Sequence, residues 1–306
     1  MSLVSKLRPA GPNGFGYGST ALDVTQGLDL TGKTYLVTGA NSGLGQESLR
    51  VLRLRGATVY GAGRSVERVR KVCADVGAIP IGCELSNPKS VRACVDQLNK
   101  ASVQLDGVLC NAGIMALPEL KQVYGYESQF FTNHVGHFLL VTTLLPTLAR
   151  QARIVVVSSN AHRRAPDVGI EFDNLSGDKG YEPWTAYGQS KLANLLFVRY
   201  LAQLLKGSGQ TAYALHPGVI KTNLTRSMGL RTKLAFTLAS PLVLKNIAEG
   251  AATQCYLLTH PSVSADQSGG YFSHCNPARC YRHGDDMNMA TRLWEVTERI
   301  AGQLGM

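Results

Sequence analysis

Short apolar runs alternate with longer segments of helical period along most of the chain after residue 32. The runs are rich in Val, Ile and Leu, whereas the longer segments repeat their apolar positions every three or four residues. The runs predict strands at 34–38, 58–61, 79–83, 107–110, 153–158, 212–215 and 270–272. The longer segments predict helices at 45–55, 66–76, 88–100, 124–150, 185–206 and 245–259.

This alternation determines the expected fold class. Near-continuous apolar strands separated by helices are typical of a parallel sheet that is covered on both faces. We therefore expect an α/β fold with a single doubly wound parallel sheet of about seven strands. Residues 31–306 would form that domain. Residues 1–30, which are rich in Gly, Pro and Ser, would form an N-terminal arm with a short helix near 20–26.

Composition and charge narrow the functional classes. The chain has 31 basic and 21 acidic residues, a formal net charge of +10, but the basic residues occur singly and in pairs rather than in a run or an aromatic-interleaved patch. We therefore expect no nucleic-acid partner. The seven cysteines are odd in number, and four lie in segments predicted as buried helix or strand. This favours reduced thiols in an intracellular protein, cytoplasmic by default.

The sequence shows neither a secretory signal nor a transmembrane segment. The first ten residues lack the apolar core and cleavage site of a secretory signal. The longest apolar candidate, 234–244, is interrupted by Pro241 and is shorter than the ~18 residues of a membrane span. We expect no transmembrane segment. Peripheral membrane contact through this run stays open, as does a homo-oligomer.

The first predicted strand leads directly into a glycine-rich turn, Thr38-Gly-Ala-Asn-Ser-Gly-Leu-Gly45, and a helix follows. The glycines allow a tight turn that brings backbone N–H groups and a helix N-terminus against a pyrophosphate, with no Cβ atom in the way. A strand before and a helix after are the context that a dinucleotide-binding turn requires. The predicted cofactor contacts here are Gly39, Asn41, Ser42, Gly43, Leu44 and Gly45.

The residues at the end of the second predicted strand indicate whether the cofactor is NAD(H) or NADP(H). In a dinucleotide-binding fold, an acidic residue there accepts hydrogen bonds from free ribose hydroxyls. This chain has Gly63-Arg64-Ser65 instead. A guanidinium can form a bidentate contact with a 2′-phosphate and stack on adenine. Arg64 therefore favours NADP(H), with NAD(H) as the alternative.

Tyr187 and Lys191 are the candidate acid/base pair. They lie four residues apart in a segment predicted as helix, so their side chains project from one face. A phenol with a pKa near ~10 is a poor acid or base at neutral pH, but a neighbouring cation favours the phenolate and lowers that pKa. No other tyrosine in the chain has a lysine four residues later.

Taken in order, the motifs of this chain resemble those of the short-chain dehydrogenase/reductase family from about residue 33 to residue 294. The matching strings are Thr38-Gly39-xxx-Gly43-x-Gly45, Asn111-Ala112-Gly113, Asn133, Ser158-Ser159, Tyr187-xxx-Lys191 and Pro217-Gly218-xxx-Thr222. Finer strings, such as Ser158-Ser-Asn-Ala-His162 and Ser190-Lys-Leu-Ala-Asn194, are similar to the retinol-dehydrogenase-like and WW-domain-oxidoreductase-like subgroup. The resemblance implies a Rossmann-type fold and NAD(P)(H)-dependent oxidoreductase activity.

The resemblance also implies a role for each matching residue. Tyr187 would be the acid/base residue, and Lys191 would lower its pKa and hold the nicotinamide ribose. Ser159 would hydrogen-bond the substrate carbonyl, and Asn133 would anchor a water that links Lys191 to solvent. Further cofactor contacts would come from Glu84, Leu85, Asn111, Ala112, Gly113, Pro217, Gly218, Val219 and Thr222. The segment around 223–246 would be a lid over an apolar substrate pocket.

Two features depart from the usual family pattern. Glu84 stands where an aspartate usually contacts adenine, so that contact would rest on a longer carboxylate. The interval between Ser159 and Tyr187 is long and carries three aromatic residues. These residues, Phe172, Tyr181 and Trp184, either form an apolar wall over the substrate or pack on the surface.

Other constellations are weaker indications of chemistry. His274, Cys275, Cys280 and His283 lie within ten residues, but their Cys-x4-Cys spacing is not that of a zinc knuckle, and we predict no metal site. Paired carboxylates are absent from the expected site, and no Gly-x-Ser-x-Gly elbow is present. Glycosidase and serine hydrolase chemistry are therefore disfavoured.

The sequence predicts an oxidoreductase that uses NADP(H) to interconvert a carbonyl and an alcohol on a small, largely apolar substrate. One alternative is a catalytically silent NADP(H)-binding regulatory or scaffold protein, which the loss of Tyr187 or Lys191 would have suggested. Another is a nucleotide-sugar epimerase or dehydratase, which would need a different glycine turn. The residues do not distinguish a retinoid, steroid, fatty aldehyde, quinone or xenobiotic carbonyl.

Overall fold

Eight strands form the central sheet of the computed structural model, which describes residues 9–220 and 244–306. Their order across the sheet is β10-β9-β8-β7-β4-β1-β2-β3. All neighbouring strands are parallel except for the antiparallel pair β9 and β10, so the predicted parallel sheet is confirmed. The strands are β1 (Thr34–Thr38), β2 (Thr58–Gly63), β3 (Ile79–Gly82), β4 (Gly107–Cys110), β7 (Arg153–Val157), β8 (Thr211–His216), β9 (Tyr271–Ser273) and β10 (Asn276–Pro277).

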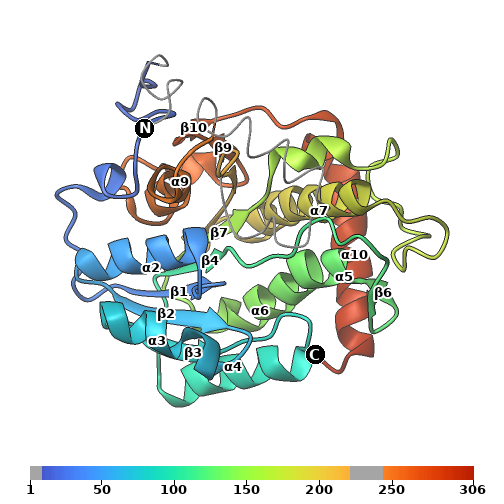
Figure 1. Cartoon of the computed structure of the whole chain (residues 1–306), viewed down its shortest axis with the longest axis horizontal. Helices are drawn as coiled ribbons and strands as arrows, with labels where there is room; N and C mark the ends of the chain where they lie inside the picture. Colours follow the sequence, from blue (N-terminus) through green and yellow to red (C-terminus); the bar gives the residue numbers. More distant parts are fainter. Residues whose placement is uncertain (1–8, 221–243) are drawn as a thin grey trace.

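Helices cover both faces of this sheet and enclose two apolar cores (Figure 1). β1 shows the division, because Leu36 lies in one core and Tyr35 and Val37 in the other, as the alternation of side chains along a strand requires. The first core also takes side chains from α4 (Pro88–Lys100), α6 (Gly136–Leu144), α7 (Pro183–Leu204) and α10 (Met287–Gln303). The second takes them from α2 (Gly43–Leu54), α3 (Val66–Val76) and α9 (Ile247–Thr259).

The predicted helix at 124–150 is wrong at both ends, and the helix between them is irregular. Residues 122–127 form a hairpin of β5 (Gln122–Val123) and β6 (Tyr126–Glu127), which turns through Gly125 at φ +80°. The Glu127 carboxylate then caps α5 (Ser128–Phe130) by accepting hydrogen bonds from Gln129 N and Phe130 N. A π-helical turn, η2 (Phe131–Val135), joins α5 to α6, and a short 3₁₀ turn, η3 (Leu145–Thr147), ends the segment. The spacing of apolar residues in the sequence does not predict the hairpin, the π-helical turn or the 3₁₀ turn.

The N-terminal segment and the remaining loops contain short helical turns. The expected helix near 20–26 is present as η1 (Asp23–Thr25). The other turns are η4 (Asn160–Arg164), η6 (Ala265–Gln267) and η7 (Arg282–Asp285). The arm packs on α9, where the Phe15 ring lies 5.7 Å from that of Tyr256. The expected lid at 223–246 falls outside the described residues except for 244–246.

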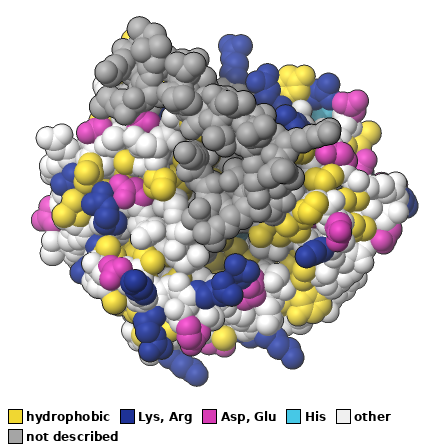
Figure 2. Space-filling view, viewed as in Figure 1, with side chains coloured by type: hydrophobic (Ala, Val, Ile, Leu, Met, Phe, Trp, Pro, Cys, Tyr) yellow, Lys and Arg dark blue, Asp and Glu magenta, His cyan; other side chains and the backbone are white. Residues whose placement is uncertain are grey.

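The surface carries basic and acidic side chains interspersed over the face seen in Figure 2. Within residues 9–220 and 244–306, no helix is long and apolar enough to cross a membrane.

The C-terminal helix α10 was not predicted, yet it closes one side of the first core. Its Trp294 ring lies 4.7 Å from Tyr200, 5.9 Å from Phe197 and 4.8 Å from Phe138. One turn further on, the Thr297 hydroxyl contacts His134 Nε2 at 3.0 Å inside the core. The helix therefore anchors α7 and the π-helical turn from outside.

Replacing Trp294 by alanine should lower the free energy of unfolding by about 3–5 kcal/mol, because it removes an aromatic side chain that three other rings surround. Urea denaturation followed by circular dichroism measures the change. Glu298→Ala on the exposed face of the same helix should change it by less than about 0.5 kcal/mol. An equally small effect at Trp294 would show that α10 does not support the core.

Candidate active site

The glycine turn between β1 and α2 has the shape that its sequence predicts. Gly39 and Gly43 adopt φ +68° and +58°, a region that favours glycine. At Gly45 a Cβ atom would lie 2.3 Å from Gly39 O and 2.6 Å from Asn111 Nδ2, so only glycine fits there. The turn thus brings the start of α2 close against the end of β4.

The N-terminus of α2 is suited to bind a phosphate. Ser42 precedes the helix in extended conformation, and its side chain makes no capping hydrogen bond to the helix. At Gly43 a Cβ atom would meet nothing within 4 Å. Uncapped N–H groups at a helix start, next to open space, form an anion site. These residues therefore fit the pyrophosphate of a dinucleotide.

Thr38 ties the end of β1 to the end of β4. Its Oγ1 accepts hydrogen bonds from Asn111 N at 2.9 Å and Ala112 N at 3.0 Å, and Asn111 Nδ2 donates to Thr38 O at 2.9 Å. His137 Nε2 also contacts Oγ1 at 3.0 Å, while its Nδ1 contacts Asn133 O at 3.0 Å. Since a carbonyl oxygen only accepts, Nδ1 carries the hydrogen, and Nε2 and Leu109 O, at 3.2 Å, are the two acceptors within reach of the Thr38 hydroxyl. Burial lowers the pKa of His137 to about 4, which agrees with a neutral ring.

Asn133 lies in the π-helical turn and is completely buried. Its amide pairs with the Ile114 backbone, accepting from Ile114 N at 2.8 Å and donating to Ile114 O at 2.9 Å. The same Nδ2 donates to Ser190 Oγ at 2.9 Å, and Ser190 Oγ donates to Tyr187 O at 2.7 Å. Asn133 thereby holds the loop after β4 against α7. Sequence reasoning did not identify Ser190, although its position between Tyr187 and Lys191 could have suggested it.

Tyr187, Lys191 and Ser159 meet at the end of β7. Tyr187 and Lys191 project from α7 and are 7% and 4% exposed, and Lys191 Nζ lies 5.7 Å from the centre of the Tyr187 ring. The ammonium donates to Val157 O at 3.0 Å. Ser159 caps η4 by accepting from Ala161 N at 3.1 Å, and its side chain lies near enough to the Tyr187 phenol to lower the phenol pKa. Together with Asn133, these three residues make four, predicted from three separate motifs, that are thus brought to one place.

Burial dominates the ionisation of this pair. It raises the pKa of Tyr187 to about 12, opposed by the nearby Ser159 side chain, and it lowers the pKa of Lys191 to about 8. Burial is the largest cause of both shifts, and the predicted lowering of the tyrosine pKa by Lys191 stays a prediction.

The other expected cofactor contacts differ in their environment. Arg64 is exposed at the end of β2, whereas the Glu84 carboxylate accepts hydrogen bonds from Ser86 N at 3.2 Å and Ser86 Oγ at 2.9 Å. Leu85 is buried. Gly113 borders the catalytic group, since a Cβ atom there would lie 3.0 Å from Asn133 Oδ1 and 3.6 Å from Lys191 Nζ.

The segment after β8 begins with Pro217 and Gly218, and Gly218 adopts φ +100°. A Cβ atom at Gly218 would lie 2.8 Å from Lys245 Cδ, because the lysine stem packs against this glycine. Lys245 N donates to Val219 O at 3.0 Å, which fixes the backbone of the segment. Thr222, the last predicted contact, lies outside the described residues.

The three aromatic residues of the long loop do not form one wall. Only Trp184 lies beside Tyr187, with ring centres 6.1 Å apart, and the Arg164 guanidinium covers it at 4.9 Å. Tyr181 donates to Leu117 O at 2.7 Å. Phe172 instead contacts Arg292 of α10 at 4.2 Å. Trp184 is therefore the aromatic residue of this loop that borders the site.

The His and Cys residues near the C-terminus do not converge. Cys275 contacts Thr253 Oγ1, whereas His283 Nε2 donates to Asp167 O at 2.8 Å. Across the described ranges, no three His, Cys, Asp or Glu side chains are grouped so that they could hold a metal ion.

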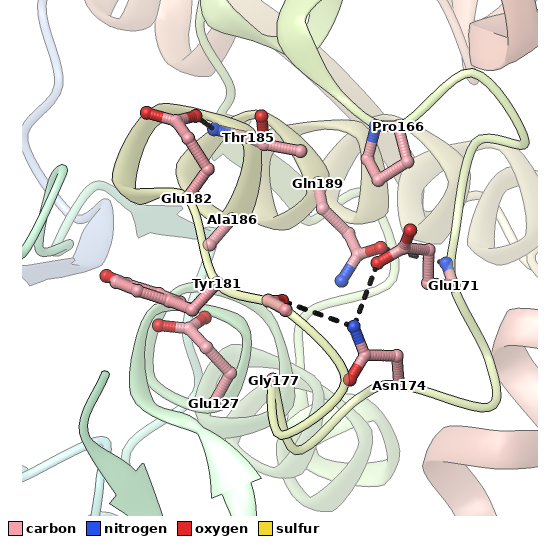
Figure 3. Close-up of a pocket in the computed structure, with 11 residues that line it drawn as sticks. Glu127, Pro166, Glu171, Asn174, Gly177, Tyr181, Glu182, Thr185, Ala186 and Gln189 are labelled. Carbon is pink, nitrogen blue, oxygen red and sulfur yellow. Dashed lines mark hydrogen bonds between the residues drawn. The ribbon is translucent and has the colours of Figure 1, made fainter. Parts of the chain in front are cut away.

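A small pocket lies against the first turns of α7 (Figure 3). Acidic side chains line it, and Asn174 Nδ2 donates to Glu171 Oε2 at 3.2 Å and to Gly180 O at 3.4 Å. None of the four expected catalytic residues lines this pocket. It is therefore separate from the site described above.

Comparison with known proteins agrees with the geometry. A family model described as short chain dehydrogenase matches residues 33–232. The chain belongs to the short-chain dehydrogenase/reductase family. This short-chain dehydrogenase/reductase is thus an NAD(P)(H)-dependent oxidoreductase, as its motifs predicted.

Curated relatives match this short-chain dehydrogenase/reductase over most of its length. Short-chain dehydrogenase TIC 32 A, chloroplastic, from Brassica napus is 38% identical, covering 96% of this chain and 97% of the relative. Retinol dehydrogenase 14 from Homo sapiens is 37% identical, covering 89% and 87%. Retinol dehydrogenase 12 from Mus musculus is 38% identical, covering 91% and 89%. These relatives confirm the predicted retinol-dehydrogenase-like subgroup.

Solved structures show the same fold. An uncharacterized protein from Mycobacterium Paratuberculosis has a TM-score of 0.73 and 32% identity, covering 90% of this chain and 96% of that one. A short chain dehydrogenase from Burkholderia cenocepacia J2315 in complex with NADP has a TM-score of 0.64 and 25% identity, covering 79% and 96%.

Lys191→Met should stabilise the protein at neutral pH. A fall in the pKa of Lys191 from 10.5 to about 8 on folding corresponds to a cost of about 3 kcal/mol. That cost is fully present below pH 8, where both states are protonated, and is gone above pH 10.5. Val157 O keeps a partner in the variant, because Asn194 Nδ2 donates to it at 3.2 Å.

Urea denaturation at pH 7 and at pH 10 measures this effect, with the exposed Lys206→Met as the control. The gain at position 191 should shrink as the pH rises. A gain of the same size at both pH values, or none at pH 7, would contradict the assignment to buried charge.

Proposed function

We propose that this protein uses NADP(H) to interconvert a carbonyl and an alcohol on a small apolar substrate, with Tyr187 as the general acid and base. The observation that carries the proposal is the buried phenol of Tyr187, which lies next to Lys191 and whose pKa the Ser159 side chain lowers. Gly113 places the loop after β4 next to this group. The glycine turn and the acid/base group thus border one site, as a hydride transfer requires.

Each residue has a distinct task in the proposed reaction. When bound, the nicotinamide supplies or accepts the hydride. The Ser159 hydroxyl already accepts from Ala161 N, so its hydrogen is available to donate to the substrate oxygen, where negative charge develops. The phenol of Tyr187 donates the proton that the same oxygen needs, and it takes that proton back in the reverse direction.

Lys191 and Asn133 support the proton transfer. The ammonium donates to Val157 O, and its remaining hydrogens are available to the cofactor ribose and to the proton path. A pKa of about 8 leaves Lys191 able to gain or lose a proton near neutral pH. Asn133 holds Ile114 and, through Ser190, the Tyr187 carbonyl, which maintains the spacing of the two segments that the reaction uses.

Several observations support NADP(H) as the cofactor. Arg64 is exposed at the end of β2 and has no acidic residue beside it in the sequence. A guanidinium at this edge suits the additional 2′-phosphate of NADP(H). A solved relative was found in complex with NADP.

The substrate proposed is an apolar aldehyde or ketone, or the corresponding alcohol. Trp184 borders Tyr187 and offers an aromatic surface next to the reacting group. Two of the relatives are retinol dehydrogenases, whose name states an apolar alcohol as substrate. A retinoid or another long apolar aldehyde is therefore the first compound to test.

Tyr187→Phe should lower turnover by at least about 100-fold, because it removes the acid/base group and leaves the ring in place. The assay is NADPH oxidation with purified protein across a panel of apolar aldehydes and ketones. Binding of NADPH, followed by its fluorescence, should be nearly unchanged. Tyr126→Phe, on the hairpin outside the site, is the matched control and should retain activity. Turnover like the wild type at position 187 would refute the mechanism.

Arg64→Asp should shift cofactor preference toward NADH. Loss of a charge-assisted contact worth about 1.5–3 kcal/mol would lower the ratio of NADPH to NADH efficiency by at least about tenfold. The measurement is kcat/KM with each cofactor. Arg70→Asp makes the same charge change on the exposed face of α3 and should leave the ratio near that of the wild type. An unchanged ratio in the Arg64 variant means that another residue reads the phosphate.

A further inference from the structure

His162 is a buried histidine whose two ring nitrogens both have partners. It lies in η4, three residues after Ser159, and is only 4% exposed. Its Nδ1 contacts Ser159 O at 2.7 Å, and its Nε2 contacts Tyr281 N at 3.1 Å. The edge of the ring packs against Tyr271, with centres 5.4 Å apart. The reaction proposed above does not use this side chain.

The partners determine the protonation of the His162 ring. A carbonyl oxygen only accepts, so Nδ1 must donate to Ser159 O. A backbone N–H only donates, so Nε2 must accept from Tyr281 N. The ring is therefore neutral, with its hydrogen on Nδ1. Burial lowers the pKa of His162, which agrees with a neutral ring.

These two hydrogen bonds join segments that are far apart in the sequence. One partner is the residue expected to bind the substrate oxygen. The other belongs to the C-terminal loop, residues 278–286, which also contacts the segment after Ser159. The Arg163 guanidinium lies 4.8 Å from the centre of the Tyr281 ring, and Asp167 pairs with Arg282. The C-terminal loop is thus held against η4 along several residues.

The orientation of Ser159 depends on how η4 sits on α7. At Gly188, next to Tyr187, a Cβ atom would lie 2.7 Å from Ala161 O and 2.7 Å from Ala165 N, so η4 and α7 are in direct contact. The Ser159 carbonyl accepts hydrogen bonds from His162 N at 3.0 Å and from His162 Nδ1 at 2.7 Å, and the Ser159 hydroxyl accepts from Ala161 N. The Nδ1 bond therefore adds to a backbone bond in holding the carbonyl, and rotation of the Ser159 backbone would move its side chain.

We propose that His162 is a positioning residue, which fixes the Ser159 backbone through Nδ1 and docks the C-terminal loop through Nε2. The inference rests on the proposed function of Ser159 and extends it. Through this one ring, the serine that would polarise the substrate oxygen is connected to the loop that carries Tyr281. The two bonds should therefore contribute separately to turnover and to substrate binding.

Asparagine and glutamine separate the two contributions of His162. The amide N–H of asparagine lies near the place of Nδ1, so His162→Asn keeps a donor for Ser159 O and loses the acceptor for Tyr281 N. The carbonyl of glutamine reaches the place of Nε2, so His162→Gln keeps the acceptor and loses the donor. His283→Ala is the control for the loop alone, because His283 binds Asp167 O and does not contact Ser159.

Steady-state kinetics on the aldehyde panel should distinguish the variants. His162→Gln should lower kcat by at least about tenfold with little change in KM, because a misplaced serine reduces stabilisation of the transition state. His162→Asn and His283→Ala should raise KM and leave kcat near that of the wild type. Affinity for NADPH should be unchanged in all three. Equal losses of kcat in both His162 variants, or no loss in either, would overturn the proposal.

Limited trypsin digestion gives a second measure that does not depend on activity. Cleavage after the exposed Arg279 should be faster in His162→Asn and as slow as in the wild type in His162→Gln. If the wild type reduces no compound of the panel, the proposed function fails. The His162 link is then judged by the trypsin rates, and equal rates in the two variants would overturn it.

Discussion

The parallel arrangement of β1, β4, β7 and β8 is the constraint on which the rest of this structure depends. Parallel strands end at the same edge of a sheet, so the turns that follow them meet there. The glycine turn follows β1, the Asn111–Gly113 segment follows β4, and Ser159 follows β7. Thr38 then fixes two of these ends to each other through its hydroxyl. The residues expected to bind a dinucleotide and the expected acid/base group thus meet at this edge of the sheet.

Burial gives this edge its chemistry. The ammonium of Lys191 and the phenol of Tyr187 are buried. The loss of hydration is the largest cause of the shift in both pKa values. The Asn133 amide and the two His162 nitrogens, which lie nearby, have hydrogen-bond partners. The Asn133 bonds to Ile114 and Ser190 and the His162 bond to Tyr281 join segments from different parts of the chain, so these bonds also position the residues expected to react.

Membership of the short-chain dehydrogenase/reductase family agrees with this arrangement over most of the chain. Two contacts lie next to the Tyr187 and Ser159 group. Trp184 borders Tyr187, and the C-terminal loop is docked on η4, the turn that follows Ser159, through His162 and the Asp167 pairings.

The sequence by itself determined the order of the strands and helices, the glycine turn and the spacing of Tyr187 and Lys191. Each of these depends on neighbouring residues, through apolar period, positive φ or helical register. It did not reveal α10, the π-helical turn around Asn133 or the roles of Ser190 and His162. Those depend on contacts between segments such as Trp294 with Tyr200 or His162 with Tyr281, which are far apart in the chain. Only folding decides which polar atoms are buried together, and hence which residues position the site.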